Sequence, residues 1–331
     1  MRRAAVACCC VLAAAGCGGG RHGHPDGFGQ AAWSARGGAL AYVASRHDDG
    51  PTAIYVRDRR GRTRRLTAAG LDAWSPAWSP DGRRLAYAAG RIVHPYEPAA
   101  GDLYVVSADG RGRVRLTRTA ADESSPSWSP DGLRLAYVRG GRIFVISATG
   151  TGARPLTRGD DGEPQWSPDG RWIAYVHGSL GDGELTIVHP DGTGSRRLAG
   201  PGVDCPRWSP RGVRIAFRVY GAVRVVDVRG GPILAPVSAV TDGYSCDYAW
   251  SPDGRAIVVA RLTSDGEWQL QTIDVASFRA RTIATLPYDE LGPDLEPAWA
   301  PAPAIAVGGD DLRLVDPSTG SVSVLRARID G

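Results

Sequence analysis

The sequence predicts an all-β fold built from repeated units, and three observations predict it. First, seven tryptophans open a similar short motif, at intervals of 45, 50, 38, 42, 42 and 49 residues. Second, short apolar runs rich in β-branched and aromatic residues follow each motif, as is typical of strands. Third, no stretch shows apolar residues at the 3.6-residue period of a helix. The seven tryptophans are Trp33, Trp78, Trp128, Trp166, Trp208, Trp250 and Trp299.

The motif itself predicts a tight turn between two strands. Four copies read Trp-Ser-Pro-Asp-Gly, the fifth repeat has Arg in place of Asp, and the first reads Trp-Ser-Ala-Arg-Gly. Proline presets φ, the serine and aspartate can bond nearby backbone N–H groups, and glycine relieves the exit from the turn. The last copy, at Trp299, has decayed to Trp-Ala-Pro-Ala-Pro.

Each repeat holds enough residues for a four-stranded unit. In the second repeat the apolar segments 84–87 and 102–106 read as strands, Asp-Gly at 109–110 marks a hairpin, and 114–117 closes the unit. Such small sheets need neighbours, and packing them radially around an axis buries both faces and leaves only short edges. We therefore expect a seven-bladed β-propeller, with six blades as the alternative because the seventh motif has decayed. We expect the tryptophans to pack between blades.

These motifs resemble the propeller repeats of TolB and of the N-terminal propeller domains of prolyl oligopeptidases. The resemblance covers about 300 residues, from Gln30 to the end of the chain. It departs from TolB in two respects, since TolB has six blades and carries an α/β domain before its propeller. The resemblance therefore implies a TolB-like propeller rather than TolB itself.

The N-terminus reads as an export signal. Arg2 and Arg3 precede an apolar run over 4–15, which is too short to span a bilayer but suits a signal peptide. The run ends in Ala-Ala-Gly-Cys17, which resembles the lipobox of bacterial lipoproteins, although that family prefers leucine at the first position. The resemblance implies a signal peptide over 1–16 and lipidation of Cys17. An ordinary secretory signal with an incidental cysteine is the alternative.

A flexible tether would then follow over 17–30, and the propeller would occupy 31–331. We expect the protein to be exported and lipid-anchored at the outer face of the cell membrane, or in the periplasm or outer membrane of a Gram-negative source. Despite the formal charge of +4 we predict no nucleic-acid partner, because the 39 basic residues, all arginine, are interleaved with 35 acidic ones.

The sequence contains no recognisable catalytic motif. There is no Gly-x-Ser-x-Gly, no His-Glu-x-x-His and no phosphate-binding glycine loop. We therefore predict a protein that is not an enzyme and needs no cofactor. Three histidines, His47, His94 and His177, lie in loops expected at one face, but they belong to blades one, two and four, so we predict no metal site. The long loop 90–101 is a candidate partner contact.

One feature suggests a binding surface. Acidic residues repeatedly precede the tryptophans, in segments that reach one mouth of a propeller channel. Converging carboxylates would form a negative rim that attracts cations or a basic segment of a partner. The alternative is that Asp and Glu simply favour turns and strand ends. The candidate rim comprises Asp72, Asp122, Glu123, Asp161, Glu163, Asp204, Asp247, Asp294 and Glu296.

Two cysteines remain after removal of the signal and lipidation. Cys205 and Cys246 precede successive tryptophans by three and four residues, so we predict a disulfide between blades five and six. Two free buried thiols are the alternative.

These expectations favour a non-catalytic, lipid-anchored envelope scaffold that binds a protein or peptide through its acidic channel face. The alternative is a carbohydrate-binding protein, or a metal-dependent lyase or hydrolase, acting at the channel mouth.

Overall fold

The computed structural model describes residues 28–34, 38–44, 52–90, 101–178, 181–234, 248–287, 297–300, 304–307 and 312–325. Within these ranges every regular element is a strand, and the strands form seven antiparallel sheets. The described residues include no helix long and apolar enough to cross a membrane. The fold is the predicted seven-bladed β-propeller, and the six-bladed alternative is wrong.

Each blade takes its strands from one continuous segment of the chain. Blade 1 comprises β1 (Phe28–Trp33), β2 (Ala39–Ala44), β3 (Ala53–Asp58) and β4 (Thr63–Arg65). Blade 2 comprises β5 (Asp72–Trp78), β6 (Arg84–Gly90), β7 (Asp102–Ser107) and β8 (Val114–Arg115). Blade 3 comprises β9 (Glu123–Trp128), β10 (Arg134–Arg139), β11 (Arg142–Ser147) and β12 (Arg154–Pro155). Blade 4 comprises β13 (Asp161–Trp166), β14 (Ile173–His177), β15 (Glu184–Val188) and β16 (Arg196–Ala199).

The remaining blades follow the same plan with one variation. Blade 5 comprises β17 (Val203–Trp208), β18 (Arg214–Val219) and β19 (Ala222–Asp227). A single bridge between Val225 and Leu234 stands where its fourth strand would lie. Blade 6 comprises β20 (Tyr248–Trp250), β21 (Ala256–Leu262), β22 (Glu267–Asp274) and β23 (Ala280–Pro287). Blade 7 comprises β24 (Ala298–Trp299), β25 (Ile305–Val307), β26 (Leu312–Val315) and β27 (Val322–Leu325). Strand β1 already begins at Phe28, inside the segment predicted to be tether.

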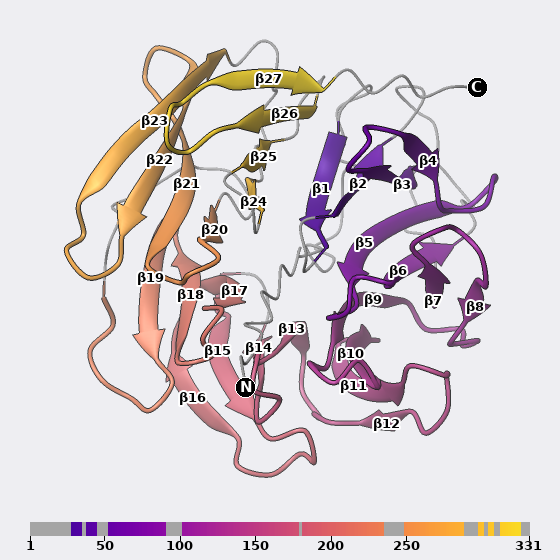
Figure 1. Cartoon of the computed structure of the whole chain (residues 1–331). Coiled ribbons are helices and arrows are strands. Elements are labelled where there is room, and N and C mark those ends of the chain that lie inside the picture. Colours follow the sequence, from indigo (N-terminus) through magenta and orange to yellow (C-terminus); the bar gives the residue numbers. More distant parts are fainter. Residues whose placement is uncertain are drawn as a thin grey trace, which may run out of the picture.

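The first strand of each blade lies closest to the central axis (Figure 1). Hydrophobic clusters fill the spaces between adjacent blades, so each sheet is covered on both faces. The tryptophans lie at these interfaces. The indole N–H of Trp78 donates to the carbonyl of Ala32 in the preceding blade, at 2.9 Å, and Trp128 donates in the same way to Ala77, at 3.0 Å. These bonds give the tryptophans a structural role between blades.

The same contact closes the ring. Trp33 in blade 1 donates its indole N–H to the carbonyl of Ala298 in blade 7, at 3.2 Å. Leu40 and Tyr42 of blade 1 share a hydrophobic cluster with Ala306 of blade 7. Figure 1 shows the yellow last blade beside the indigo first blade. The ring is therefore closed by side-chain packing, and among the described strands no blade combines strands from both ends of the chain.

The Ser-Pro-Asp-Gly segments form the predicted turns at one end of the ring. In blade 2 the hydroxyl of Ser79 donates to Asp81 at 2.6 Å, and the Asp81 carboxylate accepts the backbone N–H of Arg83 at 3.0 Å. Gly82 has a φ of 67°, a conformation that glycine adopts without strain. We call this end of the ring, with its turns and outer hairpins, the turn end.

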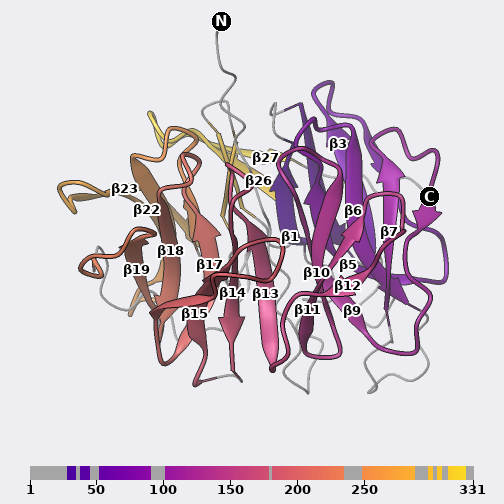
Figure 2. The same ribbon diagram turned by 90° about the horizontal axis from the view of Figure 1, so that it is seen from below.

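The opposite end is where the innermost strands begin and the second strands finish. The register shows this directly, because Asp72 pairs with Gly90 and Asp161 pairs with His177. The predicted acidic segments and the loops after the second strands therefore share one end of the molecule, which we call the acidic end. Figure 2 shows the ring from the side, with the strands running between its two ends.

Candidate functional site

Three carboxylates of the acidic end are held in cross-strand pairs within their own blades. In blades 3, 4 and 5, each lies directly opposite a basic residue near the end of the second strand. Directly opposed residues are close neighbours on a sheet, so opposite charges there stabilise the pairing. The pairs are Glu123 with Arg139, Asp161 with His177, and Asp204 with Arg218.

Glu123 is the most enclosed of these groups. It is 0% exposed, and its carboxylate accepts hydrogen bonds from Thr117 at 3.1 Å, from Thr119, and from the Nε of Arg139 at 2.9 Å. A carboxylate with this many donors is a structural group between blades 2 and 3. The prediction that Glu123 belongs to an accessible binding rim is therefore wrong.

Asp161 is also buried, but its partner reaches solvent. Its side chain is 1% exposed, whereas the His177 side chain is 51% exposed, and Asp161 Oδ1 lies 2.7 Å from His177 Nδ1. An ionised carboxylate only accepts, so Nδ1 carries the proton and the carboxylate orients the ring. Burial removes Asp161 from the predicted contact surface and leaves His177 as the accessible member of the pair.

Asp204 and Arg218 form a two-pronged ion pair in blade 5. The Nε and Nη2 of Arg218 lie 2.7 and 2.8 Å from the two carboxylate oxygens, and this geometry fits a guanidinium to a carboxylate. Arg218 is buried, and Asp204 keeps about a quarter of its side-chain surface exposed. Asp204 therefore stays at the acidic end, but with its charge balanced.

Aspartates in blades 2, 3 and 4 occupy one equivalent position, six residues before the tryptophan. Asp72 accepts the backbone N–H of Thr52 in the preceding blade at 2.7 Å, and Asp122 accepts that of Gly101 at 2.9 Å. Asp122 and Asp160 are exposed, and Asp72 is half-buried. These three carboxylates have no basic side chain as an ion-pair partner among the described residues, so no ion pair balances their charge.

Glu163 lies further along its innermost strand, three residues before Trp166. Its carboxylate accepts the backbone N–H of Cys205 in blade 5 at 2.6 Å, although its side chain remains partly accessible. The pKa of the Glu163 carboxyl is raised to about 7, chiefly by burial and also by the nearby Asp204 carboxylate. The Cys205 N–H and the guanidinium groups of Arg207 and Arg218 oppose this shift. Glu163 therefore exchanges a proton near neutral pH.

Cys205 is disulfide-bonded, and its carbonyl accepts the hydroxyl of buried Tyr248 in blade 6. Cys246 lies outside the described residues, so the Cys205–Cys246 pairing stays a prediction. The other candidates outside the described residues are Cys17, His47, His94, Asp247, Asp294 and Glu296, together with most of the loop 90–101.

Sequence reasoning missed the two arginine partners of the acidic end, and it placed His177 at this end but in a loop rather than opposite Asp161. Arg139 and His177 end the second strands of blades 3 and 4, and Arg218 lies one residue before the end of that strand in blade 5. The sequence feature that could have revealed these partners is a basic residue or histidine at the end of the apolar second strand in blades 3, 4 and 5. Among the described residues, no three histidine, cysteine or carboxylate side chains cluster as metal ligands would.

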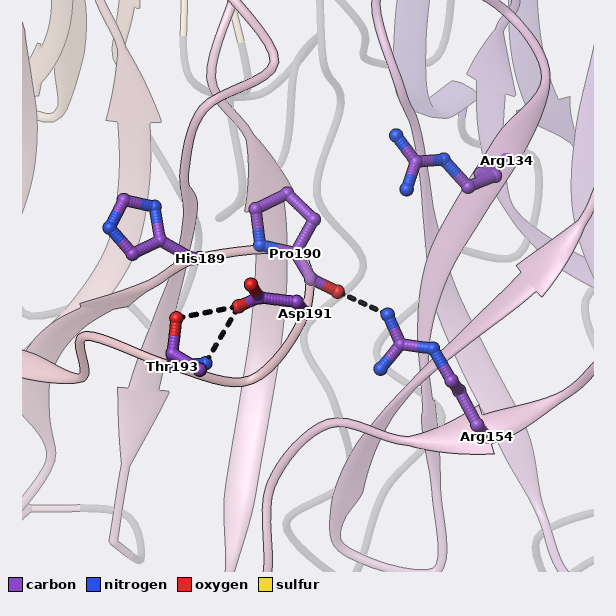
Figure 3. Close-up of a pocket in the computed structure, with 6 residues that line it drawn as sticks. All are labelled: Arg134, Arg154, His189, Pro190, Asp191 and Thr193. Atoms are coloured by element: carbon purple, nitrogen blue, oxygen red, sulfur yellow. Dashed lines mark hydrogen bonds between the residues drawn. The ribbon is translucent and has the colours of Figure 1, made fainter.

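A separate pocket opens at the turn end between blades 3 and 4. Its volume is about 480 Å³, and it is lined by Arg134, Arg154, His189, Pro190, Asp191 and Thr193 (Figure 3). The repeat motifs did not predict this pocket, because its lining residues come from two blades that are brought together only in the folded ring.

The fold and its repeats agree with a known family. The family described as TolB beta propeller domain (PD40) matches residues 30–225, more than half of the chain. The chain belongs to this family. No curated protein matches it.

Solved structures share the fold of this TolB-type propeller at low sequence identity. TolB from Acinetobacter baumannii is 20% identical, with a TM-score of 0.56 over 76% of this chain and 64% of that one. An oligogalacturonate lyase in complex with manganese is 15% identical, with a TM-score of 0.66 over 84% of each chain. A puromycin-hydrolyzing peptidase of Mycobacterium tuberculosis is 16% identical, with a TM-score of 0.68 over 92% of this chain and 53% of that one. The chain thus spans about two thirds of that TolB and half of that peptidase.

Proposed function

We propose that this TolB-type propeller is a non-catalytic envelope scaffold that binds a basic segment of a protein partner at its acidic end. The observation that carries the proposal is the equivalent placement of Asp72, Asp122 and Asp160 in three successive blades. A rigid scaffold spaces these charges regularly, and such an arrangement steers and selects a partner of opposite charge.

The proposed contact surface is smaller than the acidic rim predicted from the sequence. Glu123 and Asp204 are ion-paired with arginines and Asp161 is buried beside His177, so none of the three presents an exposed, unpartnered carboxylate. Glu163, in β13 and three residues after Asp160, adds a carboxyl that titrates near neutral pH. The proposed contact surface is therefore centred on blades 2 to 4, with Asp122 and Asp160 as its most exposed anions.

Capture from envelope extract by the immobilised mature protein tests this proposal. We expect the variant Asp122→Lys/Asp160→Lys to lose the captured partner, because two attractive charges become repulsive. The variant Asp109→Lys/Asp316→Lys, altered in hairpins of the turn end, is the control and should keep it. Equal capture by both variants, with unchanged melting temperatures, would exclude this surface.

We further propose that Cys17 anchors the propeller to a membrane. The basic residues, apolar run and cysteine at the N-terminus support this placement. Membrane fractionation should show the Cys17→Ala variant in the soluble envelope fraction, and retention of that variant on the membrane would contradict lipid anchoring.

A second candidate is an enzyme acting at the same end, and the His177–Asp161 pair favours it. A half-exposed imidazole oriented by a buried carboxylate is suited to bind a metal or accept a proton. Two of the structural neighbours are enzymes, one of them in complex with manganese. A rise in melting temperature with Mn²⁺ that disappears in His177→Ala would favour this candidate. An unchanged melting temperature across divalent ions would favour the scaffold.

A further inference from the structure

In the pocket at the turn end, Arg134 forms different hydrogen bonds from the equivalent arginine of the preceding blade, Arg84. Arg84 in blade 2 and Arg134 in blade 3 occupy equivalent positions, six residues after their tryptophans. Each guanidinium lies over the tryptophan of the next blade, Arg84 over Trp128 at 4.7 Å and Arg134 over Trp166 at 4.9 Å. The two positions therefore share the same packing.

Their hydrogen bonding differs. Arg84 donates from Nη2 to the carbonyl of Gly132 in the next blade, at 2.8 Å. Arg134 makes no equivalent side-chain hydrogen bond among the described residues, and its nearest carboxylate, Asp131, is 3.9 Å away. The interface beyond it is also irregular, because the buried indole N–H of Trp166 has no hydrogen-bond partner there. The guanidinium of Arg134 thus keeps its donors available beside the pocket.

A second guanidinium reaches the same space from the outer strand. Arg154 extends from β12 and donates from Nη2 to the carbonyl of Pro190, and its remaining N–H groups have no partner among the described residues. Figure 3 shows Arg134 and Arg154 both directed toward the hairpin that carries Pro190 and Asp191. Two cations therefore line one side of the pocket.

The hairpin on the other side is held in place by its own contacts. His189 stacks on Trp172, with ring centroids 3.9 Å apart, and its Nδ1 lies 3.0 Å from the carbonyl of Arg171. Asp191 Oδ1 accepts the backbone N–H of Thr193 at 2.9 Å and its hydroxyl at 2.7 Å. The Thr193 backbone N–H holds the pKa of Asp191 below its usual range, so this carboxylate is ionised. Its other oxygen remains as a hydrogen-bond acceptor.

We propose that this pocket binds a phosphate group carried on a hydroxylated carbon skeleton, such as a glycerol phosphate. Guanidinium groups match phosphate oxygens in geometry, and the negative charge of a phosphate monoester or diester offsets their positive charge. The hydroxyl groups of the ligand donate to Asp191, which would repel a bare anion. The cavity of about 480 Å³ accommodates a ligand of this size. The site is independent of the acidic end.

Isothermal titration of the mature protein with glycerol 1-phosphate tests the free-ligand form of this proposal. We expect Arg134→Gln and Arg154→Gln each to weaken binding by about tenfold or more, because each removes a charge-assisted contact. Arg84→Gln is the matched control and should bind as the wild type does, since Arg84 is committed to Gly132. Melting temperatures close to the wild-type value would show that the variants are folded.

Flotation of the unlipidated Cys17→Ala variant with phosphatidylglycerol vesicles distinguishes the two sources of this chemistry. Binding to the vesicles, but not to phosphatidylcholine vesicles, that is lost in Arg134→Gln would assign the site to a lipid headgroup. Binding of glycerol phosphate alone would assign it to a soluble ligand. Absence of both, or binding that persists in Arg134→Gln and Arg154→Gln, would overturn the proposal.

Discussion

Four residues in the innermost strands hold a conformation that non-glycine residues seldom adopt. Ser75, Ser125, Glu163 and Cys205 each stand three residues before a tryptophan, with φ values of 56°, 52°, 55° and 52°. Each lies where the innermost strand shifts register against its neighbour, as a β-bulge does. The repeat thus places a strained residue at the same point in four blades, and in blade 4 that residue is Glu163.

Glu163 gives the fold a pH dependence that one substitution should remove. The pKa of this carboxyl is about 7 in the folded protein, against an ordinary value of 4.5. Between these values the folded state keeps a proton that the unfolded state has lost, so the free energy of unfolding falls as the pH rises. The full effect is at most about 3 kcal/mol.

Glu163→Gln should flatten this dependence, because the amide is neutral throughout and can still accept the Cys205 N–H. Urea denaturation should show a variant close to the wild type at pH 4.5 and more stable than it at pH 8. Glu267→Gln, which removes an exposed carboxylate of β22, is the control and should keep the wild-type slope. A wild-type slope in Glu163→Gln would contradict the raised pKa.

At this scale the sequence placed the described acidic residues of blades 2 to 5 at one end, but it did not predict what they contact; Asp247, Asp294 and Glu296 lie outside the described residues. Glu123 and Asp122 are adjacent in the chain, yet one is fully buried and the other exposed. Glu123 contacts Arg139, and Asp122 accepts the backbone N–H of Gly101. Both partners come from other parts of the chain, so the residues around the tryptophan do not predict these contacts.

Turns and strands were more predictable from the sequence than the contacts of single residues, because interactions between residues close in the chain determine them. The Ser-Pro-Asp-Gly segments form turns whose serine and aspartate bond within a few residues, so the motif alone specifies the geometry. The second strands were predictable from their apolar runs. The pairing of their terminal basic residues with carboxylates of the first strands was not predicted, because an ion pair across two strands depends on register, and register emerges only when the sheet forms.

The pair between β9 and β10 should contribute measurably to stability. Arg139→Ala leaves the buried Glu123 carboxylate without its cation, and breaking such a pair costs about 3 kcal/mol or more. Arg142→Ala removes an exposed arginine three residues away and should cost less than about 0.5 kcal/mol. Chemical denaturation would measure both, and equal small losses would show that Glu123 does not depend on Arg139.

The whole molecule depends on the meeting of its first and last blades. Seven tryptophan motifs predicted seven blades, although the last motif lacks the residues that form the turn. Blade 7 nevertheless forms four strands and packs against blade 1, because tertiary packing compensates for a weak local signal. The pocket at the turn end was unpredictable for the same reason, since its lining comes together only when blades 3 and 4 dock.

Closure of the ring between blades 7 and 1 is the central claim, and the indole N–H of Trp33 reports on it directly. In the closed ring this group donates to Ala298, as Trp78 donates to Ala32. Hydrogen exchange of the indole groups, followed by NMR with Trp33→Phe and Trp78→Phe for assignment, would compare the two sites. Closure predicts protection of Trp33 similar to that of Trp78. Rapid exchange of Trp33 in a protein that still protects Trp78 would show an open array and contradict the account.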